Sequence, residues 1–300
     1  MPSSKPSPSG DDNWNRYRPL IDDRLQKYLT PREDCPPRLH EAMSYSLLAD
    51  GKRMRPILVL LACEACGGAI EAALPAACAL EMVHAYSLIH DDLPAMDDDD
   101  YRRGRLTNHK VFGEAMAILA GDALLTLAFQ IVAEEIEPPD VAARCCVDLA
   151  KGAGMCGMVG GQVADLEGEE TEYPTLAQLE GIHRRKTGRL LACALALGGR
   201  IAQTEETALA NLSKYGDCIG LAFQIVDDLL DLRGDQQKLG KGVRKDADRG
   251  KLTYPSLLGE TESRQRACHL VAEAITCVEP FGDRGRRLAS LARFIVERDH

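Results

Sequence analysis

The spacing of apolar residues changes near residue 14 of this 300-residue chain. Residues 1–13 are rich in Pro and Ser and carry no periodic apolar pattern, which is typical of a disordered tail. From Trp14 onward, leucine, alanine and other helix formers recur every three or four residues, whereas alternating strand patterns and Asn-Gly hairpin turns are absent. The pattern predicts an all-α fold.

Glycine and proline mark most gaps between the expected helices. Pro75 is expected near the first position of its helix, where a missing N–H leaves no hydrogen bond unmade. No internal linker rich in Pro, Ser or Gly divides the chain, so a single domain is expected over residues 14–300. The expected helices are 14–29, 36–50, 54–66, 75–93, 109–135, 139–158, 175–200, 205–232, 254–260, 263–278 and 284–298.

Composition narrows the functional classes. With 45% hydrophobic residues the chain can form a large core, which excludes a disordered or fibrous protein. The formal net charge is −10, so the overall field opposes a sequence-independent attraction to nucleic acid or to anionic lipid. An anionic ligand would therefore have to be held by local positive charges.

Two features bear on cellular location. The 11 cysteines are odd in number and spread along the chain, and the amino terminus lacks the apolar core of a signal peptide, so reduced thiols in the cytoplasm are expected. The longest apolar run, residues 115–133, is interrupted by Gly121, Asp122 and Gln130, so no integral membrane segment is expected. Cys63 and Cys66 form a CxxC pair without a second pair, which favours buried thiols over a zinc site.

The first acidic cluster contains Asp91, Asp92 and the run Asp97–Asp100. Two like charges ~4 Å apart repel by about 4 kcal/mol at an effective dielectric constant of 20, so packed carboxylates need cations among their oxygens. Mg²⁺ suits such sites, because it keeps several waters and shares its ligand shell with substrate phosphates. Pro94 breaks the helix and is expected to let Asp97 turn back towards Asp91.

The second acidic cluster interrupts an apolar helix where charge is unexpected. Asp227 and Asp231 are four residues apart and share a helix face with Gln224. Either cluster alone is typical of a solvated surface. Two aspartate clusters at the carboxyl ends of two apolar helices are better explained by a shared metal and phosphate site at the mouth of a bundle.

Basic residues that could hold phosphate lie near these clusters. Lys52 and Arg55 are three residues apart at the start of an expected helix, where the helix dipole also favours an anion. His84 lies two turns before Asp91 on the same helical face. A lone His or Lys is more often structural, so only the whole set is persuasive. The other members of the set are Arg102, Arg103, His183, Arg184, Arg185 and Lys186.

Four stretches of the sequence together resemble the trans-isoprenyl diphosphate synthases of the polyprenyl synthetase family, most nearly the bacterial farnesyl type. The resemblance covers the chain from about residue 20 to its end. The spacing of Leu93 to Met96 between aspartates matches the insertion found in bacterial farnesyl and plant-type geranylgeranyl enzymes. The matching strings are GKRMRP at 51–56, SLIHDDLPAMD at 87–97, KTG at 186–188 and GLAFQIVDD at 220–228.

The resemblance implies an antiparallel helical bundle around a deep apolar cavity, and a homodimer. It implies three Mg²⁺ ions, with Mn²⁺ as an alternative, bound by Asp91, Asp97 and Asp227. The residues implied for the allylic diphosphate are Arg102, Lys186, Thr187, Gln224 and Lys241. The residues implied for isopentenyl diphosphate are Gly51, Lys52, Arg55, His84 and Arg103.

The implied reaction condenses isopentenyl diphosphate with dimethylallyl or geranyl diphosphate to farnesyl diphosphate. The allylic carbon–oxygen bond ionises, the π-bond of isopentenyl diphosphate attacks the cation, and the departing diphosphate takes the proton. The Lys186–Thr187 backbone carbonyl and the Gln224 side-chain carbonyl would stabilise the cation. Dry apolar walls would keep water from it.

Product length is expected to depend on Tyr86 and Ser87. Tyr86 lies five residues before Asp91, which places it ~7.5 Å deeper along the helix. The resemblance implies that an aromatic ring here forms the floor of the cavity and stops the product at C15, whereas a smaller side chain allows C20. Ordinary core packing of the aromatic is the alternative interpretation.

Other functions remain open at this point. A geranylgeranyl diphosphate synthase would share every motif. A terpene cyclase would need no second diphosphate site, so Lys52, Arg55 and His84 count against it. A non-catalytic partner subunit would not need the second acidic cluster. The carboxyl end, residues 297–300, is less basic than in many members of the resembling family, and Arg298 is its one basic candidate for substrate binding.

Overall fold

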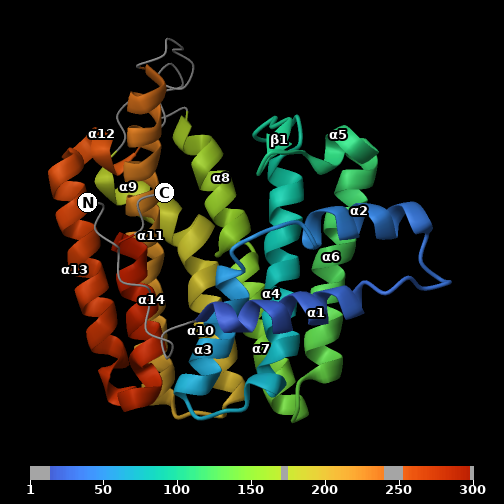
Figure 1. Cartoon of the computed structure of the whole chain (residues 1–300), viewed down its shortest axis with the longest axis horizontal. Coiled ribbons are helices and arrows are strands. Elements are labelled where there is room, and N and C mark those ends of the chain that lie inside the picture. Colours follow the sequence, from blue (N-terminus) through green and yellow to red (C-terminus); the bar gives the residue numbers. More distant parts are fainter. Residues whose placement is uncertain (1–13, 170–174, 240–252, 298–300) are drawn as a thin grey trace, which may run out of the picture.

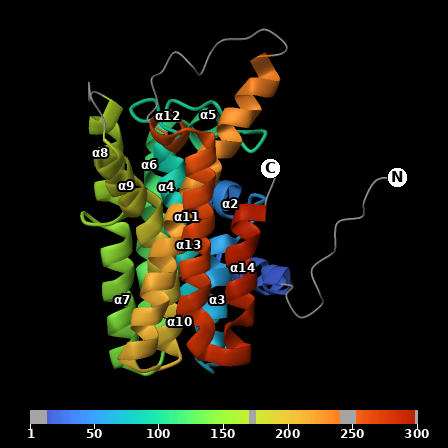
Figure 2. The same cartoon turned by 90° about the vertical axis from the view of Figure 1, so that its left-hand side faces the viewer.

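The computed structural model is a bundle of long helices packed antiparallel to their sequence neighbours, and it describes residues 14–169, 175–239 and 253–297 (Figure 1). Turning the molecule by 90° shows α11, α13 and α14 side by side on one face (Figure 2). The long helices are α3 (Met54–Ala65), α4 (Ile70–Asp91), α6 (Glu114–Glu135), α7 (Pro139–Ala153), α10 (Arg189–Ile201), α11 (Glu206–Leu239), α13 (Glu260–Val278) and α14 (Arg286–Glu297).

Shorter elements surround this bundle. Helices α1 and α2 cross the long helices in Figure 1, and a small hairpin projects beyond the end of α4. The hairpin pairs β1 (Tyr101–Arg102) with β2 (Arg105–Leu106). The remaining helical elements are η2 (Trp14–Tyr17), α1 (Arg18–Tyr28), α2 (Pro37–Leu47), α5 (Asn108–Phe112), α8 (Met158–Glu169), α9 (Leu176–His183), the π turn η3 (Arg184–Gly188), α12 (Tyr254–Leu258) and η4 (Glu279–Gly285).

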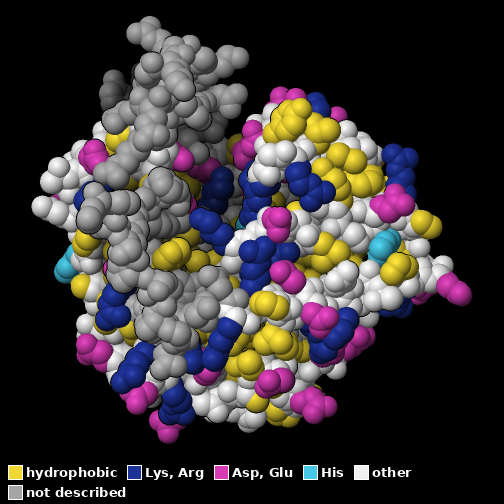
Figure 3. All heavy atoms as spheres, viewed as in Figure 1, with side chains coloured by type: hydrophobic (Ala, Val, Ile, Leu, Met, Phe, Trp, Pro, Cys, Tyr) yellow, Lys and Arg dark blue, Asp and Glu magenta, His cyan; other side chains and the backbone are white. Residues whose placement is uncertain are grey.

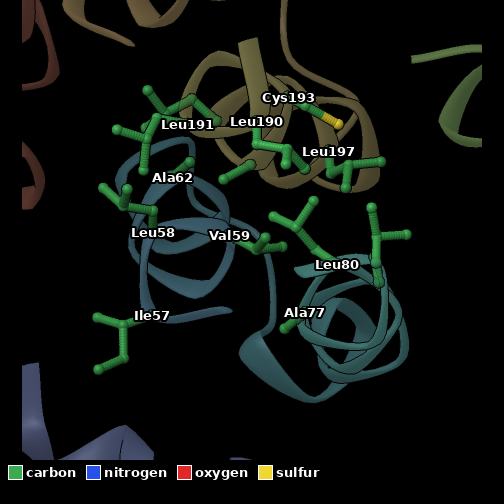
Figure 4. Packing of buried hydrophobic residues seen from close by; sticks show 14 of the residues in the cluster. Ile57, Leu58, Val59, Ala62, Ala77, Leu80, Leu190, Leu191, Cys193 and Leu197 are labelled. Atoms are coloured by element: carbon green, nitrogen blue, oxygen red, sulfur yellow. The ribbon is translucent and has the colours of Figure 1, made fainter. Parts of the chain in front are cut away.

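The centre of the bundle is formed by α3, α4 and α10, whose side chains interlock in Figure 4. Leu58 from α3, Leu80 from α4 and Leu190 from α10 are completely buried. A helix that is apolar on every side must be surrounded by protein, and most of α4 meets that condition. The core therefore holds the helix that carries the first acidic cluster.

The all-α prediction is confirmed, and the short β1–β2 hairpin is the exception to the expected absence of strands. The expected start of a helix at Pro75 is wrong, because α4 already begins at Ile70 and Pro75 lies inside it. Proline in a helix removes one backbone hydrogen bond. Ala73 and Pro75 are both buried, so their packing outweighs that loss.

Three other helix boundaries differ from the prediction. The expected helix 109–135 is broken at Gly113, whose φ of 89° favours glycine and separates α5 from α6. The expected helix 139–158 ends at Ala153, and α8 was not predicted at all. Glycines in its first turns lower the helix propensity of α8. The expected helix 175–200 is interrupted by the π turn η3.

The expected end of the helix at residue 232 is also wrong. Helix α11 continues to Leu239, so Asp227 lies inside the helix and not at its carboxyl end. Three sequence predictions, the tail of residues 1–13, Lys241 and Arg298, lie outside the described residues.

Among the described residues, α4 and α6 are long and apolar enough to cross a membrane by length and composition. The sequence-based expectation that no stretch is apolar enough was therefore too strict. The isolated polar residues in α6 still leave its mean hydropathy at 1.9. Core helices of soluble proteins pass the same test, and 78% of the apolar window of α4 is buried in the bundle. In α6 only 39% is buried.

Candidate active site

An apolar cavity of about 420 Å³ lies between α4, α8 and the π turn η3. Its walls include Met96 and Met158, and most of its polar groups come from residues that the sequence singled out. Those residues are Arg55, His84, Tyr86, Ser87, Asp91, Lys186 and Thr187. The structure thus brings together candidates from three separate motifs around one cavity.

A second cavity, here called the arginine cavity, has a volume of about 330 Å³. His84 and Leu88 of α4 line both cavities, so this helix forms the wall between them. In Figure 3, Lys and Arg side chains gather in and below a hollow on this face of the molecule. The charged residues lining the arginine cavity are Asp50, Arg53, Glu81, Asp92, Arg102, Arg103 and Arg105.

The first acidic cluster turns back on itself as expected. The backbone N–H of Asp97 donates to the carbonyl oxygen of Asp91 at 2.8 Å. Burial raises the pKa of Asp91 to about 6; the Lys186 ammonium opposes this shift, and the Asp97 carboxylate adds to it. A nearby cation would therefore stabilise the charged form of Asp91.

The other aspartates of this cluster have different roles. Asp92 is 3% exposed and accepts a hydrogen bond from Nε of Arg102 at 2.6 Å. Asp98 and Asp99 are exposed, and Asp100 pairs with Lys110 at 2.8 Å. Asp97 is exposed as well, so the exposure of the whole run Asp97–Asp100 agrees with the solvated-surface interpretation. Arg102, which the resemblance assigns to the allylic diphosphate, lines the arginine cavity.

Arg55 and His84 meet beside the wall between the cavities. Nη1 of Arg55 lies 3.2 Å from Nε2 of His84, which accepts the hydrogen bond. Burial, together with Arg55 and Arg103, holds the pKa of His84 well below its usual value, so the ring is neutral at pH 7. Burial also lowers the pKa of Arg55, against the opposing effects of Glu81 and Asp227.

The guanidinium of Arg55 is incompletely paired. Its Nε is buried and has no hydrogen-bond partner among the described residues. A buried donor without a partner costs free energy that an incoming acceptor can recover. Arg55 and His84 thus form a preformed site for an anion.

The Gly51–Arg55 segment divides into structural and accessible positions. Arg53 is 6% exposed and pairs with Glu81 at 2.9 Å and with Asp22 at 2.8 Å. Lys52 is exposed to solvent. Arg103 donates to the carbonyl oxygen of Asp50 at 2.7 Å, and a methyl group at Gly51 would lie 2.5 Å from its Nη1. A larger side chain at Gly51 would therefore displace the guanidinium of Arg103.

Lys186 projects from the π turn towards the apolar cavity. Its Nζ donates to Oδ2 of Asp165 on α8 at 2.6 Å. Gln162, on the same helix, lines the cavity. The sequence pattern did not single out either α8 residue, because it predicted no helix there. Two polar residues three apart in an apolar stretch were the available signal.

The second acidic cluster lies in α11. Gln224 and Asp227 are half-buried, and Asp231 is exposed. Oδ2 of Asp228 accepts a hydrogen bond from the backbone N–H of Tyr254 at 2.9 Å, which anchors the start of α12. Among the described residues, no three His, Cys, Asp or Glu side chains are grouped closely enough to hold a metal ion by themselves.

Tyr86 is 6% exposed and lines the apolar cavity. Its ring packs edge-on against His90, with ring centres 5.5 Å apart. Nε2 of His90 lies 3.1 Å from the carbonyl oxygen of Ile118, and a methyl group at Gly121 would overlap the His90 ring. The tyrosine is thus held from behind by α6. The neighbouring Ser87 donates to the carbonyl oxygen of His84 at 2.9 Å.

The CxxC pair lies outside both cavities. Cys63 is buried and Cys66 half-buried, and neither forms a disulfide. Burial raises the pKa of the Cys63 thiol to about 12. The prediction of a buried thiol is confirmed for Cys63, whereas Cys66 is only half-buried.

Comparison with known proteins finds close relatives along nearly the whole chain. A farnesyl diphosphate synthase from Geobacillus stearothermophilus is 45% identical over 289 residues, covering 95% of this chain and 97% of the relative. A geranylgeranyl diphosphate synthase from Cyanophora paradoxa is 46% identical and covers 94% of both chains.

A solved structure is also similar. The apo structure of an FPP/GFPP synthase from Zymomonas mobilis matches with a TM-score of 0.85 at 40% identity, covering 94% of this chain and 97% of that one. The family model for polyprenyl synthetase matches residues 36–279, which include both acidic clusters and both cavities. From its motifs, its helical fold and these relatives, the chain belongs to the polyprenyl synthetase family.

Proposed function

We propose that the chain makes farnesyl diphosphate from isopentenyl diphosphate and dimethylallyl or geranyl diphosphate. The general activity is established by the family: the chain is a short-chain trans-prenyltransferase. The specific proposal rests on one observation, that α4 separates an arginine-rich cavity from an apolar cavity lined by a buried tyrosine. The first suits a diphosphate and the second suits a growing prenyl chain.

The carboxylates fit divalent cations. The raised pKa of Asp91 records the cost of burying a carboxylate near Asp97. Carboxylate oxygens are the ligands that Mg²⁺ prefers. We assign three Mg²⁺ ions, with Mn²⁺ as an alternative, to Asp91, Asp97 and Asp227. When bound, these ions neutralise the charge that develops on the departing diphosphate.

At the allylic site, residues of the protein bind the diphosphate, stabilise the cation and exclude water. We assign Lys186, Arg102, Thr187, Gln224 and Lys241 to the allylic diphosphate. Lys186 can donate to the phosphate oxygens from its place in the cavity wall. Carbonyl oxygens of the Lys186–Thr187 peptide and of Gln224 can stabilise the allylic cation. Met158 and its apolar neighbours exclude water, which would otherwise trap the cation as an alcohol.

Isopentenyl diphosphate is assigned to Gly51, Lys52, Arg55, His84 and Arg103. The buried Nε of Arg55 supports this assignment, because a phosphate oxygen would supply its missing acceptor. Neutral His84 can donate a hydrogen bond without adding a charge beside four arginines. Arg55 and His84 both line the apolar cavity, so an isopentenyl diphosphate held there would have its π-bond on the same side of α4 as the allylic carbon.

The test of the function is direct. Purified protein is incubated with Mg²⁺, labelled isopentenyl diphosphate and geranyl diphosphate, and the products are sized after phosphatase treatment. A C15 alcohol is the expected product. A C20 alcohol would identify a geranylgeranyl diphosphate synthase, and no incorporation of label by folded protein would contradict the prenyltransferase assignment.

A terpene cyclase is the second candidate from the sequence. It ionises one diphosphate and has no use for another. The arginine cavity and the unpaired Nε of Arg55 favour two diphosphates instead. Formation of a terpene hydrocarbon from geranyl or farnesyl diphosphate alone, without isopentenyl diphosphate, would indicate a cyclase instead.

Replacing Tyr86 by Ala is expected to lengthen the product from C15 to C20. The substitution removes a ring that lines the cavity and leaves room beside Ser87 for another five-carbon unit. Chain-length analysis of the variant measures the shift. The matched control is Tyr45→Ala, since Tyr45 lines the arginine cavity and its loss should leave the product at C15. Unchanged C15 product from Tyr86→Ala would mean that other residues form the floor.

We also propose a homodimer that forms through α6. Ile118 and Leu119 on this helix are 43% and 54% exposed, and the apolar window of α6 is largely uncovered in one chain. An unpartnered apolar face of this kind marks an interface. A second copy would cover it, which is compatible with the cytoplasmic location that we propose.

Leu119→Arg is expected to raise the dimer dissociation constant about 30-fold, since a charge placed in an apolar interface costs about 2 kcal/mol. Sedimentation velocity across a concentration series measures the change. Phe294→Arg on α14, 38% exposed, is a control that should leave dimerisation intact. A wild-type chain that sediments as a monomer at micromolar concentration would rule out the α6 dimer, and binding to vesicles would indicate a membrane surface instead.

Finally, we propose that residues 14–300 form one catalytic domain. One continuous cluster of buried apolar residues extends from Tyr17 in η2 to Ile295 in α14. Limited proteolysis is expected to leave this unit intact. Two stable fragments with separate unfolding transitions would contradict it.

A further inference from the structure

Helix α8 contacts the Lys186 segment in two ways. A methyl group at Gly161 would lie 2.2 Å from the backbone nitrogen of Lys186, so α8 and the π turn touch backbone to backbone at this glycine. One turn further along α8, Oδ2 of Asp165 accepts a hydrogen bond from Nζ of the same lysine at 2.6 Å. The base and the tip of Lys186 are therefore both held by one helix.

Two carboxylates compete for the Lys186 ammonium. Lys186 lines the same cavity as Asp91, and its Nζ contacts Oδ2 of Asp165 at 2.6 Å. A lysine side chain is long and flexible, and it can change partners at little cost. Without Asp165, the closest remaining carboxylate of the cavity would be that of Asp91, a proposed metal ligand.

We propose that Asp165 is a positioning residue that holds the Lys186 ammonium at the cavity wall and away from Asp91. This inference rests on the proposed role of Lys186 in binding the allylic diphosphate. An ammonium group has three N–H donors, so Lys186 can keep its bond to Asp165 while it donates to a phosphate oxygen. Asp165 is absent from the cavity lining and acts only through the lysine.

The geometry of α8 makes this arrangement specific. Gly161 and Asp165 are four residues apart and lie on the same face of the helix. The glycine sets the distance between α8 and the π turn, and the carboxylate then reaches Nζ from a fixed backbone. Asp165 is 34% exposed at its side chain and Lys186 is 30% exposed, and Lys186 alone of the two lines the cavity.

The test compares Asp165→Asn with the wild-type enzyme, using geranyl diphosphate, isopentenyl diphosphate and Mg²⁺. Loss of the ion pair is expected to raise KM for geranyl diphosphate about tenfold, in line with the strength of a charge-assisted hydrogen bond. The Mg²⁺ concentration for half-maximal activity should rise too, because the freed lysine competes for Asp91. KM for isopentenyl diphosphate should change less than twofold. Asp165→Glu keeps the carboxylate, so its KM for geranyl diphosphate and its Mg²⁺ requirement should stay close to those of the wild type.

Asp148→Asn is the matched control. Asp148 on α7 pairs with Arg200 at 3.1 Å and is similarly half-buried, but it lines neither cavity. This variant is expected to lower the thermal midpoint without changing either KM. A purely structural role for Asp165 would give the same pattern as Asp148→Asn and would overturn the proposal.

A double-mutant cycle separates the inference from the function on which it rests. Because Asp165 acts through Lys186, the double variant Asp165→Asn, Lys186→Met should be no worse than Lys186→Met alone. Additive losses in KM for geranyl diphosphate would overturn the positioning role. If Lys186→Met itself leaves that KM unchanged, the proposed allylic site is wrong.

Discussion

Replacing Asp91 by Asn is expected to lower kcat/KM on the order of 10²–10³-fold, the usual cost of removing one group that stabilises transition-state charge. Asn keeps the size of the side chain but loses the negative charge that we assign to Mg²⁺ binding. The fold should survive, because burial already disfavours the charged form of Asp91. Steady-state kinetics at several Mg²⁺ concentrations measure the loss.

The control for this prediction lies in the same acidic cluster. Asp98 is exposed and lines neither cavity. Asp98→Asn makes the same chemical change seven residues away and should leave kcat/KM within about twofold. Equal losses in both variants would indicate that the cluster acts through its total charge. An Asp91→Asn enzyme with more than a tenth of wild-type activity would remove Asp91 from the metal site.

Arg53→Ala is expected to destabilise the protein by about 3–5 kcal/mol, because it leaves a buried carboxylate without its partner. Arg53 and Glu81 are 6% and 5% exposed, and their side chains meet at 2.9 Å. The loss is large compared with a typical unfolding free energy of about 5–15 kcal/mol. The midpoint of urea unfolding, followed by circular dichroism, measures it.

A second variant shows whether the loss comes from the unpaired charge. Removing both partners in Arg53→Met, Glu81→Leu should recover much of the stability, since no buried charge is then left alone. An Arg53→Ala protein within 1 kcal/mol of wild type would show that solvent satisfies Glu81 instead.

The prediction of helices succeeded where local pattern dominates and failed where contacts between distant segments decide. Apolar periodicity identified α4 and α11, which carry the two acidic clusters. It missed α8, because Gly160 and Gly161 have low helix propensity. At Gly161 the backbone of α8 lies against the backbone of Lys186, and no local pattern reveals this contact.

The candidate site shows the same division. Local spacing placed Asp97 beside Asp91, because Pro94 ends the helix between them, and the hydrogen bond between their backbones follows. Local spacing also placed His84 on the Asp91 side of α4. It could not supply Asp165, whose partner Lys186 is 21 residues away on another element.

The sequence by itself determined the helical class, the positions of both acidic clusters and the family, since all of these depend on residue identity and short-range spacing. Only the tertiary structure decided which role each of two neighbouring residues of the same type has. Arg53 and Arg55 are two residues apart, yet Arg53 pairs with Glu81 and Asp22, whereas Arg55 meets His84 and keeps an unpaired buried Nε. The physical reason is that the free energy of a buried charge depends on the partners that packing brings to it, and those partners come from helices distant in the chain.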